Sequence, residues 1–565
     1  MSQRTPEKIL ITAALPYING PPHLGHIVGS HLPADIFARF ERINGRDVIF
    51  LGGTDEHGTP IELSASTNNI NLDEFKKIMR KVHKKIYDKF ELSYDIFGNT
   101  SSKFHDNFVK EFFLTLYRNG FIKEEKLKMF FCKNCERFLP GRYVEGTCKY
   151  CGYENANGDQ CENCGRSMDV YTLLNPKCKI CGSTPEIRES KHLFFRLSSL
   201  AGQIRNFLES IKKRLSKHTL NFSYSWLEQG LKDRCITRDI KNGIPIPLSG
   251  WEKKVFYVWF DALLGYISFI GEKFGKAGIE KWWKDKNVKI YQFLGKDNIP
   301  FHTIFWPAML IAHGDFNLPY KVVGLNYLLF EGKKFSKSKK IGVFCDRIVE
   351  SNIDTEALRF YLSFLIPETS DTNFSWEEFK ERVNKDLIGN IANFIWRSLY
   401  LSNDVKMPIE KTLDEDIWKE FMKPAKEYIK SMENIEIRKA LNNILSCAKI
   451  ANTYLNETEP WKENKNSRKY RIIVYNILEM SKALAIMLYP FTPSFSKKMI
   501  RCLGLKEDNI RIDKISDHEK VYSKVTIPSR PFFDKVSDED IKTLKNELST
   551  SYTIPEIIEK FSGKN

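Results

Sequence analysis

The chain has 565 residues, of which 42% are hydrophobic, 13% aromatic and 28% charged. This composition excludes a disordered chain, a collagen and a small disulfide-stapled scaffold, and at roughly 100–200 residues per domain the length predicts several domains. The 87 Lys and Arg outnumber the 71 Asp and Glu, which gives a net charge of +16. That excess predicts an anionic partner, with nucleic acid as the first expectation.

The apolar runs of the chain indicate no membrane segment. The most apolar stretch, residues 257–270, is interrupted by Asp261 and falls short of the ~20 residues that cross a bilayer. Only MSQRTPEK precedes the first apolar run, which is too little for a signal peptide. We therefore expect no membrane partner and a cytoplasmic location.

Strand-like and helix-like segments alternate over the first 118 residues, which favours a parallel α/β sheet. The first strand ends in a loop rich in Pro and Gly, and the second ends in Gly-Thr-Asp-Glu-His-Gly at 53–58. The predicted elements are strands at 8–14 and 47–52 and helices at 24–40, 73–91 and 103–118.

After a cysteine-rich interruption, the α/β character returns at about residue 226. From 376 to 535 nearly all the patterning is helical, and 536–565 reads as a mixed-charge tail. The predicted elements of this half are strands at 255–260 and 288–294, a helix at 300–312 and a lysine-rich loop at 321–345.

Eight of the twelve cysteines form four Cys-x-x-Cys pairs. The pairs are Cys132/Cys135, Cys148/Cys151, Cys161/Cys164 and Cys178/Cys181; the scattered cysteines are Cys235, Cys345, Cys447 and Cys502. In a reducing compartment such pairs indicate metal rather than disulfides, and Zn²⁺ takes four thiolates at tetrahedral corners. The pairs therefore predict two structural zinc sites, and the sequence does not dictate which pairs combine.

Two further motifs suit phosphate. His23-Leu24-Gly25-His26 opens a helix, whose N-terminus offers N–H groups and a positive dipole end to an anion. Residues 333–340, with sequence Lys-Lys-Phe-Ser-Lys-Ser-Lys-Lys, suit a mobile loop that closes on polyphosphate. Taken singly, each has a plain alternative, a capped helix with two incidental histidines and a solvated basic loop.

Together the two motifs resemble the signatures of class I aminoacyl-tRNA synthetases, H-I-G-H and K-M-S-K-S, with Leu24 and Phe335 as the departures. The closer resemblance, over residues 8–535, is to the methionyl-tRNA synthetase family in its archaeal or eukaryotic-like form with four Cys-x-x-Cys pairs. Five stretches carry it in order: Ala14-Leu15-Pro16-Tyr17-Ile18-Asn19-Gly20, Gly53-Thr54-Asp55-Glu56-His57-Gly58, Tyr257-Val258-Trp259-Phe260-Asp261-Ala262, Gly295-Lys296-Asp297 and Phe301-His302-Thr303-Ile304-Phe305-Trp306-Pro307.

The resemblance implies a methionine–tRNA ligase, which joins methionine to ATP, releases pyrophosphate and transfers methionine to the 3′ end of tRNA(Met). It implies a split Rossmann-type catalytic domain with a zinc-knuckle insertion, followed by an α-helical anticodon-binding bundle, with Mg²⁺ accompanying ATP. The implied bounds are 1–118 and 226–320 for the catalytic halves, 119–225 for the insertion, 321–385 for the lysine loop and connecting module, 386–535 for the bundle and 536–565 for the tail. The insertion is too small for a large editing domain, which favours methionine over branched-chain substrates.

The resemblance also implies roles for individual residues. For catalysis these are His23, His26, Lys334 and Lys337. For ATP they are His23, Gly25, His26, Gly295, Asp297 and Lys337. For methionine they are Leu15, Tyr17, Asp55, Trp259, Ala262, Tyr266 and His302, with Asp55 on the α-ammonium group. For the CAU anticodon they are Asn393, Arg397 and Trp461, against a plain reading of Trp461 as a core residue of the bundle.

For the metal, the resemblance implies an inner zinc site from Cys148, Cys151, Cys161 and Cys164 and an outer site from Cys132, Cys135, Cys178 and Cys181. Sequential pairing remains the alternative. The implied partners are tRNA(Met), ATP and methionine. The 30 residues after 535 are too few for a dimerising barrel, so we expect a monomer, and a separate tRNA-binding protein remains an open possibility.

Two other functions compete with this reading. A non-catalytic zinc-containing RNA-binding protein could keep a synthetase shell, but the intact His23, His26 and Lys337 argue against it. The class I cysteine enzyme uses a metal-bound thiolate in its pocket, and the sequence places no zinc ligands beside Trp259 or His302.

Overall fold

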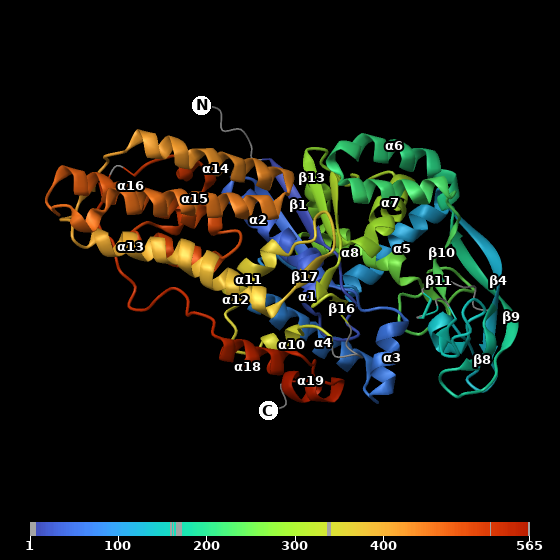
Figure 1. Cartoon of the computed structure of the whole chain (residues 1–565). Helices are drawn as coiled ribbons and strands as arrows, with labels where there is room; N and C mark the ends of the chain where they lie inside the picture. The colour runs from blue at the N-terminus through green and yellow to red at the C-terminus, as the bar shows by residue number, and fades with distance from the viewer. Residues whose placement is uncertain are drawn as a thin grey trace.

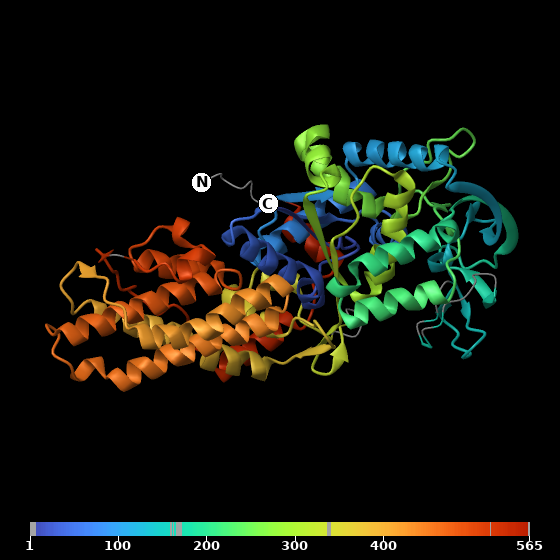
Figure 2. The same cartoon turned by 90° about the horizontal axis from the view of Figure 1, so that it is seen from above.

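The computed structural model describes residues 7–158, 161, 163–164, 166, 172–335, 341–519 and 521–562. Figure 1 shows an α/β lobe on one side and an elongated helical bundle on the other. The cysteine-rich insertion projects from the α/β lobe at the end farthest from the bundle, and Figure 2 shows the same arrangement from above.

A five-stranded parallel sheet forms the centre of the α/β lobe, in the order β14-β13-β1-β2-β3. The strands are β1 (Lys8–Ala13), β2 (Asp47–Thr54), β3 (Ile96–Asn99), β13 (Val288–Gly295) and β14 (Lys321–Leu325). Because the chain runs from β1 outward to β3 and returns on the other side of β1, the strand order reverses between β1 and β13. A crevice at the carboxyl ends of strands at such a point is the usual ligand position in this kind of sheet.

Helices cover both faces of this sheet, as the alternating pattern predicts. The helix after β1 runs continuously through α1 (Leu24–His26), a π-turn at Ile27–His31 and α2 (Leu32–Ile43). The predicted helices at 73–91 and 103–118 are confirmed as α4 (Leu72–Lys89) and α5 (Lys103–Arg118). In chain order, α3 (Thr59–Thr67) stands between β2 and α4, and the long α8 (Val258–Ile279) precedes β13.

Two predicted elements of the second half are wrong. The strand expected at 255–260 is only β12 (Val255–Phe256), because Tyr257 is the N-cap of α8; a short aromatic and β-branched run fits a strand and a buried helix start equally well. The loop expected at 321–345 holds β14, β15 (Leu328–Phe330) and β16 (Lys333–Lys334). The helix expected at 300–312 is confirmed as a π-turn at Phe301–Phe305 followed by α9 (Trp306–His313).

The insertion is built on two long antiparallel strands, β4 (Ile122–Cys132) and β9 (Glu186–Phe195). At its far end the strands β6 (Val144–Thr147), β7 (Ala156–Asn157) and β8 (Leu174–Cys178) form a small separate sheet. Helices α6 (Ala201–Ile211) and α7 (Lys217–Glu228) bring the chain back to the α/β lobe.

The connecting module joins the two lobes. It contains α10 (Cys345–Ile348), α11 (Thr355–Phe364) and β17 (Thr372–Phe374), which pairs with β15 in parallel. The predicted helical region follows as α12 (Trp376–Arg382), a π-helix at Val383–Ala392, α13 (Asn393–Ser402), α14 (Glu415–Asn434), α15 (Ile437–Thr458), α16 (Arg468–Leu488) and α17 (Pro493–Cys502). Residues 473–488 of α16 are buried throughout, so this helix is the core of the bundle.

The segment expected as a tail is folded. It forms α18 (Asp538–Leu548) and α19 (Ile554–Phe561), which pack back on α10, α12 and α4. Leu548 and Ile557 are fully buried there. The apolar residues of this segment recur at helical spacing, and that is why they can be buried against the α/β lobe.

Across the described ranges, the helices are too short or too polar to cross a bilayer.

Candidate active site and cysteine centres

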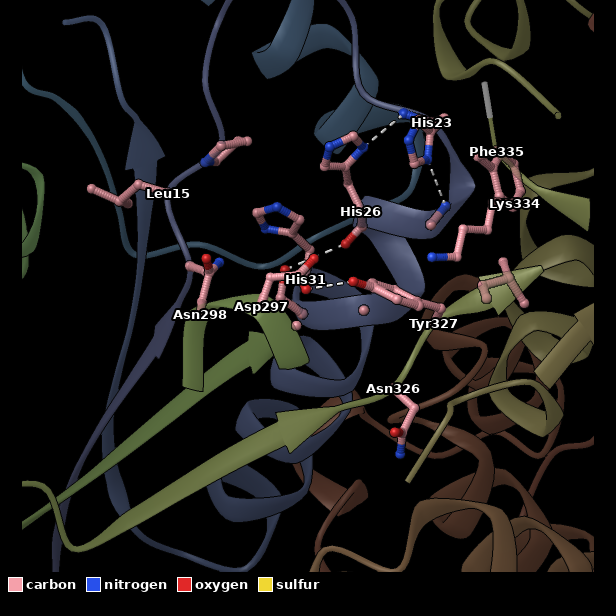
Figure 3. Close-up of a pocket in the computed structure, with 17 residues that line it drawn as sticks. Leu15, His23, His26, His31, Asp297, Asn298, Asn326, Tyr327, Lys334 and Phe335 are labelled. Carbon is pink, nitrogen blue, oxygen red and sulfur yellow. Dashed lines mark hydrogen bonds between the residues drawn. The ribbon is translucent and has the colours of Figure 1, made fainter. Parts of the chain in front are cut away.

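A cavity of about 450 Å³ opens at the carboxyl ends of β1 and β13. Three loops far apart in sequence line it: the segment after β1, the segment after β13 and residues 326–335. Figure 3 shows His23, His26, Asp297, Tyr327 and Lys334 drawn around this space. The cavity therefore brings together the predicted phosphate residues of the first half with those of the second.

The two histidines of the first motif are held by the start of their own helix. His23 is the N-cap of α1 and its Nδ1 accepts from Gly25 N at 3.1 Å, while His26 Nδ1 accepts from His23 N at 3.1 Å. A Cβ on Gly25 would lie 2.8 Å from the His23 ring, so a larger residue here would displace that ring. The capped helix expected as the plain alternative is therefore present, and the same hydrogen bonds fix both rings at the cavity wall.

The lysine-rich segment reaches the same wall. Phe335 stacks on His23 with ring centroids 4.7 Å apart and an angle of 14° between planes. Lys334 Nζ lies 5.0 Å from the centre of the Tyr327 ring, and the Tyr327 hydroxyl donates to Asp297 Oδ1. The predicted Lys334, Gly295 and Asp297 thus line the cavity, whereas the predicted Lys337 lies outside the described residues.

The seven predicted methionine residues form one connected region beside this cavity. Trp259, Ala262 and Tyr266 follow one face of α8, and the Tyr17 ring meets the Trp259 ring edge-on at 6.4 Å. Tyr17 also forms a β-bridge with Asp55. The remaining members join through Leu15, which lines the cavity, and His302, which is hydrogen-bonded to Tyr266.

Hydrogen bonds define the tautomer of His302. Burial lowers the pKa of His302 to about 4, so the ring is neutral at pH 7. Its Nδ1 lies 3.0 Å from Asn298 O and therefore carries the proton and donates. Its Nε2, 2.9 Å from the Tyr266 hydroxyl, must then accept. Both side chains are nearly fully buried, so this pair is a fixed wall of the pocket.

Two buried carboxyl groups lie close to the pocket, and only one was expected. Burial and the nearby charge of Asp261 raise the pKa of Asp55 well above its ordinary value. Asp261 is 0% exposed, and burial raises its pKa as well. Its Oδ2 lies 3.2 Å from Nδ1 of His57, whose pKa burial lowers to about 3, so His57 is neutral. Oδ1 of Asp261 has no hydrogen-bond partner among the described residues.

The sequence reasoning missed Asp261, His57, Phe301 and Tyr327 as parts of this site. Phe301 stacks on Trp259 at 4.0 Å and 10°, which makes it a second aromatic wall. A signal was present for the first three, since each stands one or two residues from a predicted residue within a quoted motif. Tyr327 had none, because it stands between two strands in a segment predicted as loop.

The cysteine pairs form two groups in the nested arrangement. Cys132, Cys135, Cys178 and Cys181 make one group, and Cys148, Cys151, Cys161 and Cys164 make the other. The sequential pairing is not what the structure has. The Sγ–Sγ distances given by hydrogen-bond contacts run from 3.4 to 3.9 Å. Four sulfurs about 2.3 Å from a tetrahedral Zn²⁺ lie about 3.8 Å apart, whereas a disulfide measures about 2.05 Å. Both groups therefore fit a metal ion and not a disulfide.

The three predicted anticodon residues meet at the surface of the bundle. Asn393 and Arg397 lie one turn apart on α13, and Trp461 follows α15. The Arg397 guanidinium lies 5.3 Å from the centre of the Trp461 ring. Trp461 is 51% exposed, so the alternative reading of it as a core residue is wrong. Tyr400, 61% exposed and also on α13, adds an aromatic surface that was not predicted.

Comparisons with known proteins agree over nearly the whole chain. The family described as "tRNA synthetases class I (M)" matches residues 9–399, and "Anticodon binding domain of methionyl tRNA ligase" matches residues 408–552. The chain is 42% identical over 563 residues to a methionine–tRNA ligase of Thermofilum pendens, covering 97% of this chain and 98% of that protein. A methionine–tRNA ligase of Picrophilus torridus is 42% identical over 513 residues, covering 90% of this chain and 74% of that protein.

A solved structure has the same fold. Mycobacterium tuberculosis methionyl-tRNA synthetase in complex with methionyl-adenylate superposes with a TM-score of 0.77 at 22% identity. The match covers 93% of this chain and 99% of that chain.

Proposed function

The chain belongs to the class I methionyl-tRNA synthetase family and is a methionine–tRNA ligase, and we propose which of its residues carry out the two steps. Methionine and ATP give methionyl-adenylate and pyrophosphate, and methionine then passes to the 3′ end of tRNA(Met). The observation that supports these assignments is the single cavity that joins both signature motifs beside the Tyr17–Trp259–Tyr266 region.

For methionine, the proposal assigns the α-ammonium group to Asp55 and the thioether to the aromatic walls. Because Asp55 is buried, ionising its carboxyl group without a cation beside it costs free energy, and burial therefore raises its pKa. The α-ammonium group of bound methionine supplies that cation. Trp259, Phe301 and Tyr266 offer flat apolar surfaces, which suit a flexible thioether because sulfur packs favourably against rings. Leu15, Tyr17, Ala262 and His302 complete the walls.

For ATP, the proposal assigns the phosphates to His23, His26 and Lys334 and the space over Gly25 to the base or ribose. Gly295 and Asp297 complete this nucleotide site. Lys337, which lies outside the described residues, is assigned to the pyrophosphate side. Negative charge builds on the phosphates as pyrophosphate leaves, and fixed cations and hydrogen-bond donors stabilise that charge. Mg²⁺ is expected to accompany ATP as part of the substrate.

For the cysteine groups, the proposal assigns one Zn²⁺ to each. All four ligand positions of each group are filled by cysteine, which leaves no open position for catalysis. The ions would fold and brace the end of the insertion. Within the part of the chain that the structure describes, the two groups are the clusters able to hold a metal ion.

For tRNA, the proposal assigns the CAU anticodon to Asn393, Arg397 and Trp461. Exposed rings with a guanidinium beside them suit stacking on splayed bases.

The domain bounds given above are kept in the proposal, except that 536–562 docks on the α/β lobe rather than trailing as a tail. A monomer in the cytoplasm is proposed, and a separate tRNA-binding protein remains an open partner.

Methionine-dependent exchange of labelled pyrophosphate into ATP tests the proposal. Pure, zinc-replete protein should exchange pyrophosphate into ATP when methionine is added, and should not do so when isoleucine, valine or cysteine is added instead. Lys337→Ala should lose exchange while keeping tRNA affinity, and Lys276→Ala, at an exposed position of α8, should change neither. No methionine-dependent exchange by the wild-type chain would refute the substrate, and unchanged exchange by Lys337→Ala would refute the role of Lys337.

A further inference from the structure

The bundle surface that holds the proposed anticodon residues continues beyond Arg397 and Trp461. Helices α13 and α16 pack against each other, and the loop between α15 and α16 lies along the end of α13. In that loop Lys465 Nζ lies 2.9 Å from Oδ2 of Asp404, which stands two residues after α13. The surface therefore runs without a break from the proposed anticodon residues to the first turn of α16.

A hollow of about 450 Å³ lies at the start of α16. Its lining includes three cations, Lys406, Arg468 and Arg471, and one carboxylate, Glu410, and its other lining residues carry no charge. A guanidinium N–H of Arg471 donates to Lys406 O at 3.5 Å, which ties the start of α16 to the segment after α13. Three cations against one carboxylate leave the hollow with a net positive charge.

The cations of the hollow differ from their neighbours in sequence because no carboxylate neutralises them. The neighbouring lysines all form ion pairs, which are Lys462–Glu459, Lys465–Asp404 and Lys469–Glu463. Lys406, Arg468 and Arg471 form no ion pair with any residue that the structure describes. Lys406 and Arg468 are exposed, and Arg471 is half-buried. The uncompensated positive charge of this basic segment is thus gathered at the hollow.

The positions of Arg468 and Arg471 are unfavourable for the folded chain alone. The two residues stand three apart on α16, where like charges repel each other. Both belong to the first turn of the helix, whose N-terminal end is itself partially positive, and that turn contains no acidic residue. An anion bound in the hollow would offset both repulsions.

We propose that Lys406, Arg468 and Arg471 bind the phosphodiester backbone of the anticodon loop of tRNA, next to the bases that the proposed anticodon residues read. This inference rests on the proposed function and extends it. The charge of the hollow suits phosphate, since a guanidinium can meet two phosphate oxygens at once, and the hollow is continuous with the proposed anticodon surface. Because phosphates carry no base identity, these cations supply affinity and register, whereas the anticodon residues supply specificity.

The salt dependence of tRNA binding tests the proposal on the full, zinc-replete chain. Labelled tRNA(Met) is titrated with the wild-type chain and with the double variant Arg468→Gln/Arg471→Gln from 50 to 300 mM KCl. Each lost contact to a phosphate of single-stranded RNA makes the slope of log K against log salt shallower by about 0.7, so the double variant should lose about 1.4. At 0.1 M salt the same loss corresponds to binding that is about 25-fold weaker.

The matched control is Lys423→Gln/Lys426→Gln. These two exposed cations of α14 have the same spacing as Arg468 and Arg471, and their replacement removes the same charge. The control should keep the wild-type slope. The loss in Arg468→Gln/Arg471→Gln should also be the same for a tRNA(Met) with one altered anticodon base, because a phosphate contact weakens binding uniformly across sequences.

An unchanged slope in the arginine variant, or an equal loss in the control, would overturn the proposal. Pyrophosphate exchange without tRNA should match the wild type in both variants, which shows that they are folded. If the arginine variant does not fold, Lys406→Gln, at an exposed position outside the helices, replaces it and should lose about 0.7 in slope.

Failure of the proposed function would look different. A wild-type chain without methionine-dependent exchange would refute the ligase assignment, and Trp461→Ala with unchanged tRNA affinity would refute the anticodon residues, while the slope reports on the cations alone. A wild-type chain that does not bind tRNA(Met) would overturn both the anticodon assignment and this inference.

Discussion

Asp261→Asn should shift the pH dependence of methionine use, because Asp261 sets the charge state of Asp55. Both carboxyl groups are nearly fully buried, and Asp261 raises the pKa of Asp55 well above its ordinary value, second only to burial in its effect. Asparagine keeps the shape of the side chain and removes its charge. The substitution therefore removes the second largest cause that raises the pKa of Asp55, after burial and ahead of the charge of Glu56.

The size of the shift follows from the repulsion between two carboxylates. Two unit charges about 6 Å apart at an effective dielectric constant of about 20 repel each other by roughly 2.8 kcal/mol, so a neighbouring carboxylate is a large effect on this scale. Asp55 must be ionised to hold the α-ammonium, so KM for methionine rises as pH falls through the pKa of Asp55. Lowering that pKa moves the acid limb of the profile to lower pH. At acid pH the variant should therefore have the lower KM.

Pyrophosphate exchange measured against methionine concentration from pH 5 to 8 checks this prediction. The matched control is Asp414→Asn at the N-cap of α14 in the bundle, where asparagine caps as well as aspartate and the same charge is lost. That variant should keep the wild-type profile. If the acid limb of the Asp261→Asn profile stays in place or moves to higher pH, the charge of Asp261 does not raise the pKa of Asp55.

Three further predictions concern the cysteine groups, the junction of the lobes and the bundle surface. Cys151→Ser should lower bound zinc from two ions to one per chain by elemental analysis, and two ions in the variant would contradict the assignment. Asp35→Asn should lower the free energy of unfolding by about 3–5 kcal/mol in denaturant titration, because it leaves Arg359, 0% exposed and 2.8 Å away, without its counter-charge. Burial opposes ionisation of Asp35, but Arg39 and Arg359 hold its pKa at about 2, so this contribution is present above pH 3.8 and is lost as pH falls through 2. Trp461→Ala should weaken tRNA charging by roughly tenfold, given ~1–3 kcal/mol per stacked base, with exchange unchanged.

The elements that the sequence predicts well are long and strongly periodic. The helices at 73–91 and 103–118 and the parallel strands at 8–14 and 47–52 each repeat one pattern over several turns or residues, so burial and propensity agree. The errors fall where elements are short. A strand of two residues such as β16, both of them lysine, carries no period and is formed by its pairing with β15. Its partner β15 ends at Phe330, just before the turn at Glu331-Gly332, so the hairpin pairing and not the composition defines this strand.

The candidate site divides in the same way. His23, Asp55, Trp259 and His302 could be found because each stands inside a motif whose residues are close in sequence. The coupling of Asp261 to Asp55 depends on elements that are adjacent only in the folded chain. Distances of this kind are set by sheet register and helix packing, which a motif does not contain.

The nested grouping of the cysteines has a physical cause in the pairing of the two strands that flank them. The strand that ends at Cys132 pairs with the strand that starts at Glu186, with Phe131 opposite Glu186. The chain between them is thus an excursion that begins and ends at one place, so its first and last Cys-x-x-Cys pairs must lie together at its base, and its two middle pairs must lie farther out. If the first Cys-x-x-Cys pair combined with the second and the third with the fourth, β4 and β9 would have to separate at the base of this excursion. The pairing of the two long strands on either side of the cysteines therefore sets this order, which the cysteine spacing alone does not dictate, and a zinc ion at the base would hold closed the same pair of strands that brings its ligands together.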